Sequence, residues 1–175
     1  AELGAAPGAE PAADFGSDLG LSAVAAHVEQ RIVLCDGGSR RPALLDALVN
    51  LGVPAKGAPR GDSAAERGQR PRVLVFAEQV RSLRALLKFL RAAGVRCAAL
   101  HGELAQSERE AALADFKAGK SPVLLSTDVA ARGLHIRKLS AIVNFDLPPK
   151  LEQYVHRAGR TGRNGEPGVA VSLVT

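Results

Sequence analysis

Residues 72–100 read RVLVFAEQVRSLRALLKFLRAAGVRCAAL. The run Arg72–Phe76 is almost wholly apolar, which is typical of a strand buried on both faces of a sheet. Residues Ser82–Ala93 form an amphipathic pattern that predicts a helix, and Gly94 is placed to end it. The leucines at helical spacing are Leu83, Leu86, Leu87 and Leu90. A second strand is expected at Val95–Leu100, and this order favours a right-handed crossover between parallel strands.

The rest of the chain alternates in the same way. Further strands are expected at Arg31–Cys35, Pro122–Ser126, Ser140–Phe145 and Val169–Val174, and further helices at Pro42–Asn50, Ala105–Ala118 and Leu151–Ala158. Strands separated by helices predict an α/β fold, a three-layer domain in which helices flank both faces of a mostly parallel sheet. Ligands of such sheets bind in the loops beyond the carboxyl ends of the strands.

The length and composition predict one folded domain. The chain has 175 residues, of which 46% are hydrophobic and 23% charged, enough for a packed core. Residues 1–20 are rich in Ala, Gly, Pro and acids and are expected to be a disordered leader or an interdomain linker. The folded domain is expected over 21–175, with a Gly- and Pro-rich flexible insertion at 52–71. Because the chain has no Met, Ala1 is interpreted as an excision point.

Membrane and secretory signals are missing from this sequence. No apolar run approaches the length of about 18 residues that a membrane span needs, and no signal peptide opens the chain. We therefore expect an intracellular protein without a membrane partner, whose compartment stays open. We also expect the chain to be monomeric. Cys35 and Cys97 are expected to be buried thiols in a reducing environment. No spacing of cysteine and histidine predicts a metal site.

The charge is concentrated in the folded part. The chain carries 23 basic and 18 acidic residues, and the first 20 residues hold four acids and no base, which leaves 23 − 14 = +9 for residues 21–175. That balance favours a polyanionic partner such as a nucleic acid. An arginine-rich composition without such a partner is the alternative, and charge alone does not choose between them.

One apparent nucleotide motif is rejected on its context. Residues 114–121, ADFKAGKS, approximate a phosphate loop. A phosphate loop follows a strand and opens a helix, whereas this segment follows a helix and precedes a strand. Gly119 is therefore interpreted as a helix end.

The segment YVHRAGRTGRNG at 154–165 carries a different pattern. Arg157, Arg160 and Arg163 recur every three residues with glycines between them. Like charges at this spacing repel, so the pattern favours an anion between the guanidiniums, which match phosphate oxygens in pairs. The glycines would let the backbone approach a partner. The alternative is a solvated basic end of a helix.

The segment STDVAARGLHI at 126–136 follows a predicted strand. Thr127 and Arg132 are candidate donors to phosphate, and Gly133 would allow a backbone N–H to come close to one. The alternative is a helical turn that Thr127 or Asp128 caps.

The segment HGELAQSER at 101–109 follows another predicted strand. Gly102 follows this strand, and Gln106 and Arg109 share a helix face near the amino end, a favourable place for an anion. The alternative is an ordinary solvated helix face.

Five segments in order resemble a known family. They are VLVF (73–76), HGELAQSER (101–109), STDVAARGLHI (126–136), VNFDLP (143–148) and YVHRAGRTGR (154–163). Together they resemble the C-terminal RecA-like domain of DEAD-box ATP-dependent RNA helicases of superfamily two, over about residues 28–175. The resemblance implies a RecA-like three-layer fold.

The resemblance also implies roles for individual residues. Arg160 and Arg163 would be catalytic arginine fingers that reach the γ-phosphate of ATP. The residues that bind ATP or couple its site to RNA would be His135, Asp146, His156 and Arg157. The residues that hold the RNA backbone would be Gly102, Gln106, Arg109, Thr127, Arg132 and Gly133.

Two positions depart from the family. His135 stands where the family usually has an Asp that resembles an acceptor for the ribose hydroxyl of the nucleotide. Gln79 stands where the family often has a Thr that would donate to an RNA phosphate. Both departures place the corresponding contact in question.

The resemblance implies that this chain is half of an enzyme. These 175 residues contain no valid phosphate loop and no Asp-Glu-Ala-Asp box, so ATP and Mg²⁺ would be bound through an N-terminal RecA-like domain of the same protein. We expect an RNA-stimulated ATPase whose partners are RNA, that domain and regulatory proteins, and expect this chain to be inactive alone. The alternative is a non-catalytic RNA clamp or protein scaffold derived from a helicase.

Overall fold

The strands form one parallel sheet in the computed structural model, which describes residues 27–36, 38–57, 71–133, 136, 139–162 and 165–175. The elements in chain order are β1 (Val28–Leu34), α2 (Arg40–Asn50), β2 (Val73–Phe76), α3 (Val80–Ala92), β3 (Cys97–Leu100), α4 (Gln106–Lys117), β4 (Val123–Ser126), α5 (Asp128–Ala131), β5 (Ala141–Asn144), α6 (Leu151–Ala158) and β6 (Gly168–Val174). The order across the sheet is β1-β6-β5-β2-β4-β3. Every pairing is parallel, which confirms the predicted fold class.

The strand β2 lies inside the sheet between β5 and β4. Val73 is in register with Ala141 of β5 and with Val123 of β4. All four residues of β2 are buried, as its apolar sequence predicts for a strand covered on both faces. Because all strands run the same way, their carboxyl ends meet at one edge, which we call the rim of the sheet.

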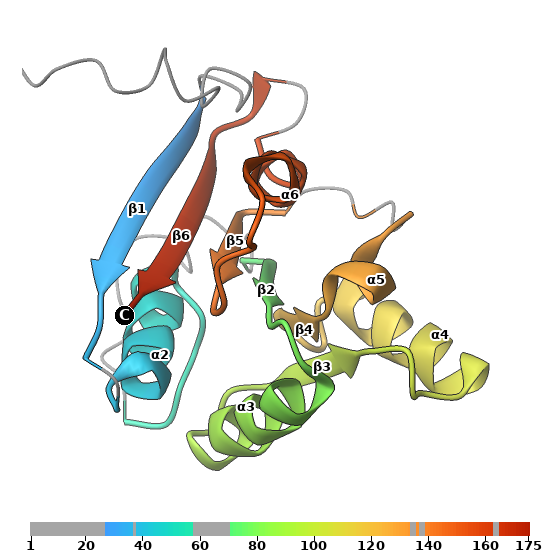
Figure 1. Cartoon of the computed structure of the whole chain (residues 1–175). Helices are drawn as coiled ribbons and strands as arrows, with labels where there is room; N and C mark the ends of the chain where they lie inside the picture. Colours follow the sequence, from blue (N-terminus) through green and yellow to red (C-terminus); the bar gives the residue numbers. More distant parts are fainter. Residues whose placement is uncertain (1–26, 37, 58–70, 134–135, 137–138, 163–164) are drawn as a thin grey trace, which may run out of the picture.

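Helices cover both faces and build two separate cores (Figure 1). On one face, Val73 and Val75 pack with leucines of α2 and α3 such as Leu44 and Leu86. On the other face, Leu74 packs with residues of α4, α5 and α6, which include Phe116, Ala130 and Ala158. The alternation along β2 thus separates two apolar layers, the arrangement of a three-layer α/β domain.

The predicted elements agree with the structure to within about three residues. The helix Leu151–Ala158 has the predicted bounds. The largest difference is at β1, which begins at Val28 because its register with β6 starts at Val28↔Gly168. The helix α4 ends at Lys117, and Gly119 follows with a φ of 72°. The segment that approximates a phosphate loop is therefore a helix end, as predicted.

Part of the expected insertion at 52–71 belongs to the packed domain. Val53 is 2% exposed and packs in the core that α2 and α3 share. The Lys56 N–H donates to the carbonyl of Ala93 at 2.9 Å. Residues 52–57 therefore pack against the domain and close the end of α3, while their flexibility stays a prediction. Residues 58–70 and the expected leader 1–20 lie outside the described residues.

The two cysteines differ in burial. Cys97 is buried in β3, as expected, whereas Cys35 is only half-buried. The expectation was wrong for Cys35 because it follows β1, the strand at an edge of the sheet. Among the described residues, no helix is long and apolar enough to cross a membrane.

Candidate functional site

Three predicted segments meet at the rim of the sheet. Gly102 lies just beyond β3, Thr127 directly follows β4, and Asp146 lies just beyond β5. These strands neighbour one another or share β2 as a neighbour. The rim therefore brings together loops that are up to about 45 residues apart in the chain, as the fold class predicts.

Arg157 is the most deeply buried cation of this region. It lies in the last turn of α6 and is 3% exposed. Its Nε donates to Oδ1 of Asp128 at 2.8 Å, and its Nη2 donates to Oδ2 of the same carboxylate at 2.6 Å. Such a bidentate contact is among the strongest hydrogen-bonded pairs in proteins. It joins α6 to α5.

The remaining face of the Arg157 guanidinium is also occupied by this chain. Nη1 donates to Oδ1 of Asn144 at 3.0 Å and to the carbonyl of Asp146 at 2.6 Å. The guanidinium carbon lies 4.8 Å from the ring centroid of Phe76, a cation–π contact. The charge of Arg157 is thus neutralised internally, as a buried charge requires. The expectation that Arg157 shares an external anion with Arg160 and Arg163 is wrong, because Asp128 already supplies that anion.

Asp146 is held by a second arginine. Nη2 of Arg40 donates to Oδ1 of Asp146 at 2.6 Å and also to the carbonyl of Phe145. The Arg40 guanidinium carbon lies 4.5 Å from the Phe145 ring centroid. The other carboxylate oxygen of Asp146 accepts the Glu78 N–H at 2.9 Å. These contacts fix the loop after β5 between the first turn of α2 and the end of β2.

The loop after β4 leaves donors at the rim. Thr127 is 8% exposed and stands at the N-cap position of α5, yet its side chain makes no capping hydrogen bond. Arg132 is exposed. Gly133 has a φ of 75°, and no atom lies within 4 Å of where a Cβ would stand. In a capped turn the Thr127 hydroxyl would accept a hydrogen bond from the backbone of α5. Because it does not, this hydroxyl can donate to a ligand.

The loop after β3 leads into α4 without crowding. Gly102 is exposed and faces open space. Gln106 begins α4, and its amide donates to Oε1 of Glu110 at 2.8 Å. Arg109, one turn further, is half-buried and has no ion pair within the described ranges. Gln106 and Arg109 lie three residues apart on one helix face, as predicted.

The segment that follows α6 carries the next residues of the arginine motif. His156 is exposed, and Arg160 is partly buried and donates its N–H to the Arg157 carbonyl at 3.1 Å. The hydroxyl of Thr161 donates to the carbonyl of Leu139 at 2.7 Å. These contacts hold the backbone that carries Arg160. Arg163 and His135 lie outside the described residues.

Gly162 is used differently from the prediction. Its φ is 64°, and a Cβ there would overlap Cγ2 of Val28 in β1. The carbonyl of Gly162 is also in contact with Nε2 of His27. This glycine was expected to admit an external partner. That expectation is wrong, because the space is filled by β1 of the same chain.

The chain is similar to known helicases in both sequence and structure. The model of the helicase conserved C-terminal domain matches residues 56–165. The pre-mRNA-processing ATP-dependent RNA helicase PRP5 of Gibberella zeae is 40% identical over 156 residues, which are 89% of this chain and 12% of that protein. The chain is a C-terminal RecA-like domain of the DEAD-box family.

Solved DEAD-box structures share its fold. A DEAD-box protein from Methanococcus jannaschii matches 85% of this chain and 36% of its own with a TM-score of 0.70 and 34% identity. Dbp5 of S. cerevisiae, solved bound to RNA and ADP BeF3, matches 86% of this chain and 36% of its own with a TM-score of 0.69 and 30% identity. This DEAD-box domain therefore spans about a third of each of these two solved chains and a smaller part of PRP5.

Several residues of the DEAD-box domain were missed by the sequence analysis. They are Arg40, Phe76, Asn144 and Phe145, which hold the charged groups at the rim, and Asp128 in its role as the partner of Arg157. Asp128 stands 29 residues before Arg157, and no local spacing could have paired the two. The available signal was the place of Asp128 and Asn144 at the carboxyl ends of buried strands.

Proposed function

We propose that this domain is the half of an ATP-dependent RNA helicase that supplies cations to ATP and holds the RNA backbone. The supporting observation is the ion pair between Asp128 and Arg157. It joins the loop that carries Thr127 and Arg132 to the segment that carries Arg160. A protein that couples the binding of RNA and ATP needs a physical connection between the two sites. The ion pair connects a candidate RNA contact to a candidate nucleotide contact.

On the nucleotide side, Arg160 and Arg163 are proposed to reach the γ-phosphate of an ATP held by the N-terminal RecA-like domain. Negative charge is spread over the phosphoryl oxygens during transfer, and a fixed guanidinium stabilises it. His135, at the position where the family resemblance implies an Asp, is proposed for the contact with the ribose. His156 would couple the nucleotide site to the RNA site across the cleft between the two domains. Asp146 would support the contact between these domains. Arg157 acts here by holding the segment in place.

Mg²⁺ is proposed to bind with ATP through the N-terminal domain of the intact protein. Within the described part of the present chain, no group of three or more His, Cys, Asp or Glu residues could hold a metal ion.

On the RNA side, the proposed contacts are independent of sequence. The hydroxyl of Thr127 and the guanidiniums of Arg109 and Arg132 suit phosphate oxygens, and Gly102 and Gly133 leave room for a backbone to approach. Aromatic residues make up only 3% of the chain, so stacking on bases contributes little. RNA and ATP would each bind better to the closed arrangement of two domains and so favour it.

ATPase assays on the intact protein and on this chain alone test the proposal. The intact protein should hydrolyse ATP with stimulation by RNA, this chain alone should not, and Arg163→Ala should abolish hydrolysis by the intact protein while RNA affinity is kept. Hydrolysis by this chain that an Arg160→Ala control lacks would refute the division of labour. RNA binding without any ATPase activity of the intact protein would favour the non-catalytic clamp.

A further inference from the structure

The helix α3 carries charge of one sign only. Its sequence VRSLRALLKFLRA contains four basic residues and no acid. The other described helices of eight or more residues each include at least one acid: Asp46 in α2, Glu108, Glu110 and Asp115 in α4, and Glu152 in α6. The bias of α3 is therefore a local property and does not follow from the arginine-rich composition of the chain.

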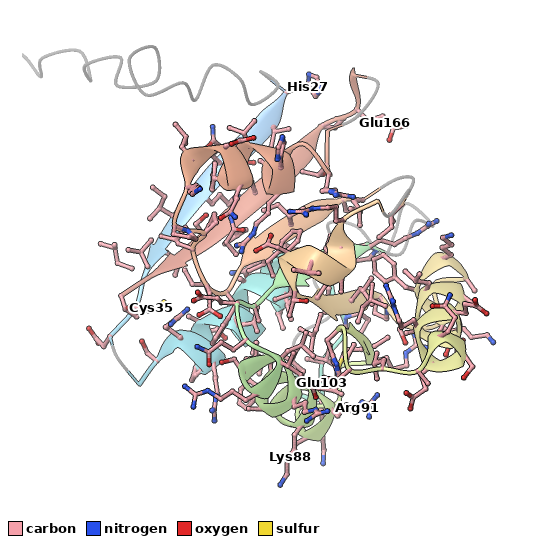
Figure 2. All side chains as sticks on the ribbon, turned by 45° about the vertical axis from the view of Figure 1, so that its right-hand side comes forward. His27, Cys35, Lys88, Arg91, Glu103 and Glu166 are labelled. Atoms are coloured by element: carbon pink, nitrogen blue, oxygen red, sulfur yellow. The ribbon has the colours of Figure 1, made fainter. Side chains whose placement is uncertain are left out.

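The four cations line one face of α3. Arg81, Arg84, Lys88 and Arg91 are all exposed. At 3.6 residues per turn they fall within an arc of about 80° and extend over about 15 Å of the helix axis. The opposite face is formed by Leu83, Leu86 and Leu90, which are buried against the sheet. Figure 2 shows Lys88 and Arg91 projecting outward from the domain.

Pairing within the chain leaves most of this charge uncompensated. Arg84 contacts Glu103 at 2.7 Å, but the side chains are 60% and 57% exposed, so the pair is solvated. Arg91 donates to the carbonyl of Cys97 at 3.3 Å, which leaves its charge in place. Among the described residues, Lys88 has no ion pair. Like charges three and four residues apart repel one another, and a bound polyanion would relieve that repulsion.

The cationic face connects two regions of the domain. At its amino end, Arg84 contacts Glu103, the residue after Gly102 in the proposed RNA loop. At its carboxyl end, Arg91 lines an open groove of about 590 Å³ together with Arg96 and Lys120. The acid in the groove lining is Asp115, whose carboxylate lies 3.5 Å from Nζ of Lys120. Positively charged side chains thus extend from the rim, where the strands end, along α3 to the side of the sheet where the strands begin.

We propose that the outer face of α3 and this groove form a second RNA-binding surface. The surface takes the phosphate backbone of RNA that continues beyond the segment held at the rim. Cations spaced by about 5 Å along the helix suit a strand that carries a phosphate every few ångströms. The inference rests on the proposed RNA contacts at the rim, and it extends the RNA path beyond the residues assigned to them.

Two RNA lengths and matched charge variants test the proposal. We would measure the fluorescence anisotropy of labelled single-stranded RNAs of about 6 and about 25 nucleotides with the 175-residue chain, over a salt series. The test variant is Lys88→Gln with Arg91→Gln. The control, Arg31→Gln with Arg41→Gln, removes the same charge from exposed positions on β1 and α2. Circular dichroism and urea unfolding establish that both variants fold.

The test variant should lose affinity for the long RNA by about tenfold at about 50 mM salt, and its salt slope should fall by about 1.4, or 0.7 for each lost phosphate contact. The short RNA should bind as to the unaltered chain. Arg96→Gln with Lys120→Gln should weaken the long RNA in the same direction. A long-RNA affinity equal to that of the control variant would overturn the proposal.

Arg109→Ala separates this proposal from the proposed function. It should weaken both RNAs, because it alters the rim. If Arg109→Ala leaves both unchanged while the α3 variant weakens the long RNA, the rim assignment fails and the second surface stands. If the α3 variant keeps its RNA affinity but no longer binds a glutamate-rich peptide, the surface serves an acidic polypeptide and the RNA proposal is wrong.

Discussion

Asp128 and Arg157 meet through two parallel contacts of 2.8 and 2.6 Å, and the guanidinium that makes them is 3% exposed. The pair joins the segments 126–136 and 154–165, which are separate motifs in the sequence. Arg157, one of three regularly spaced arginines, is therefore an internal support of the fold.

Removing this support should destabilise the domain. Arg157→Ala leaves the Asp128 carboxylate without its partner, and breaking a buried pair costs about 3–5 kcal/mol. We expect about 3 kcal/mol, the lower end, because the Asp128 side chain is 35% exposed. Urea unfolding followed by circular dichroism measures the loss. The control is Arg31→Ala, whose partner Glu29 is well exposed, so its loss should shift the unfolding midpoint far less. Equal midpoints for the two variants would contradict the assignment.

Two glycines with left-handed φ angles separate backbone strain from steric overlap. Gly162→Ala forces a Cβ into Val28 at a φ of 64°, whereas Gly119→Ala has a φ of 72° and open space. Each should cost about 1–2 kcal/mol for the backbone, and Gly162→Ala should cost at least about 1 kcal/mol more for the overlap. Thermal or urea unfolding measures the difference. Similar losses would show that β1 does not use the space beside Gly162.

Arg109 should contribute an electrostatic contact to RNA. In the intact protein, Arg109→Ala should weaken binding of unrelated RNA sequences to a similar extent and lower the salt slope of the affinity by about one. Arg31→Ala is the control, because β1 and β3 lie at opposite edges of the sheet. Anisotropy titrations over a salt series measure both quantities. A loss confined to one RNA sequence, with an unchanged slope, would argue against a phosphate contact.

The thiol of Cys97 should be slow to react. Burial raises its pKa above the ordinary value of 9.0, so the folded domain holds less of the reactive thiolate. At about pH 8, a thiol reagent should modify the half-buried Cys35 before Cys97, and denaturant should bring the two rates together. Peptide mass mapping over time identifies the site. Cys97 reacting first in the folded chain would contradict its burial.

The same group sets a direction for stability at alkaline pH. Because the folded-state pKa is raised, the unfolded chain loses this proton first as the pH rises past 9.0. Burial also raises the pKa of the Tyr154 phenol from 10.0. Stability should therefore be intact below about pH 9 and fall above it. Urea midpoints in a pH series, with Cys97→Ala as the comparison, measure how much of the fall belongs to the thiol. A Cys97→Ala chain with an identical alkaline profile would exclude this contribution.

Much of this fold follows from local sequence. Buried parallel strands are continuous apolar runs, so β2 and β4 are recognisable from their amino-acid sequences alone. The amphipathic helices are recognisable from leucine spacing, as in α3. β1 was the weakest prediction, because an edge strand exposed on one side tolerates polar residues such as Glu29 and Arg31. Its start is set by pairing with β6, whose paired residues lie 140 positions further along the chain.

The candidate site was predictable only in part. Placing residues such as Gly102 and Thr127 at the rim needs only the rule for parallel sheets. The partner of Arg157, however, lies 29 residues away, and Gly162 makes room for Val28 of β1, 134 residues before it. Repeated arginines and glycines look alike in sequence whether they contact their own fold or a ligand. Only the tertiary structure shows that Arg157 pairs with Asp128 of its own fold.

The most direct test of the central claim is the RNA-stimulated ATPase rate of the intact protein carrying Arg160→Ala. Loss of an arginine finger lowers the catalytic rate by about 10³-fold or more. We predict a loss of that size with RNA affinity within about twofold of the unaltered protein, because the ligand proposed for Arg160 is the triphosphate. An Arg160→Ala protein that keeps its ATPase rate would contradict the claim that this domain completes the ATP site.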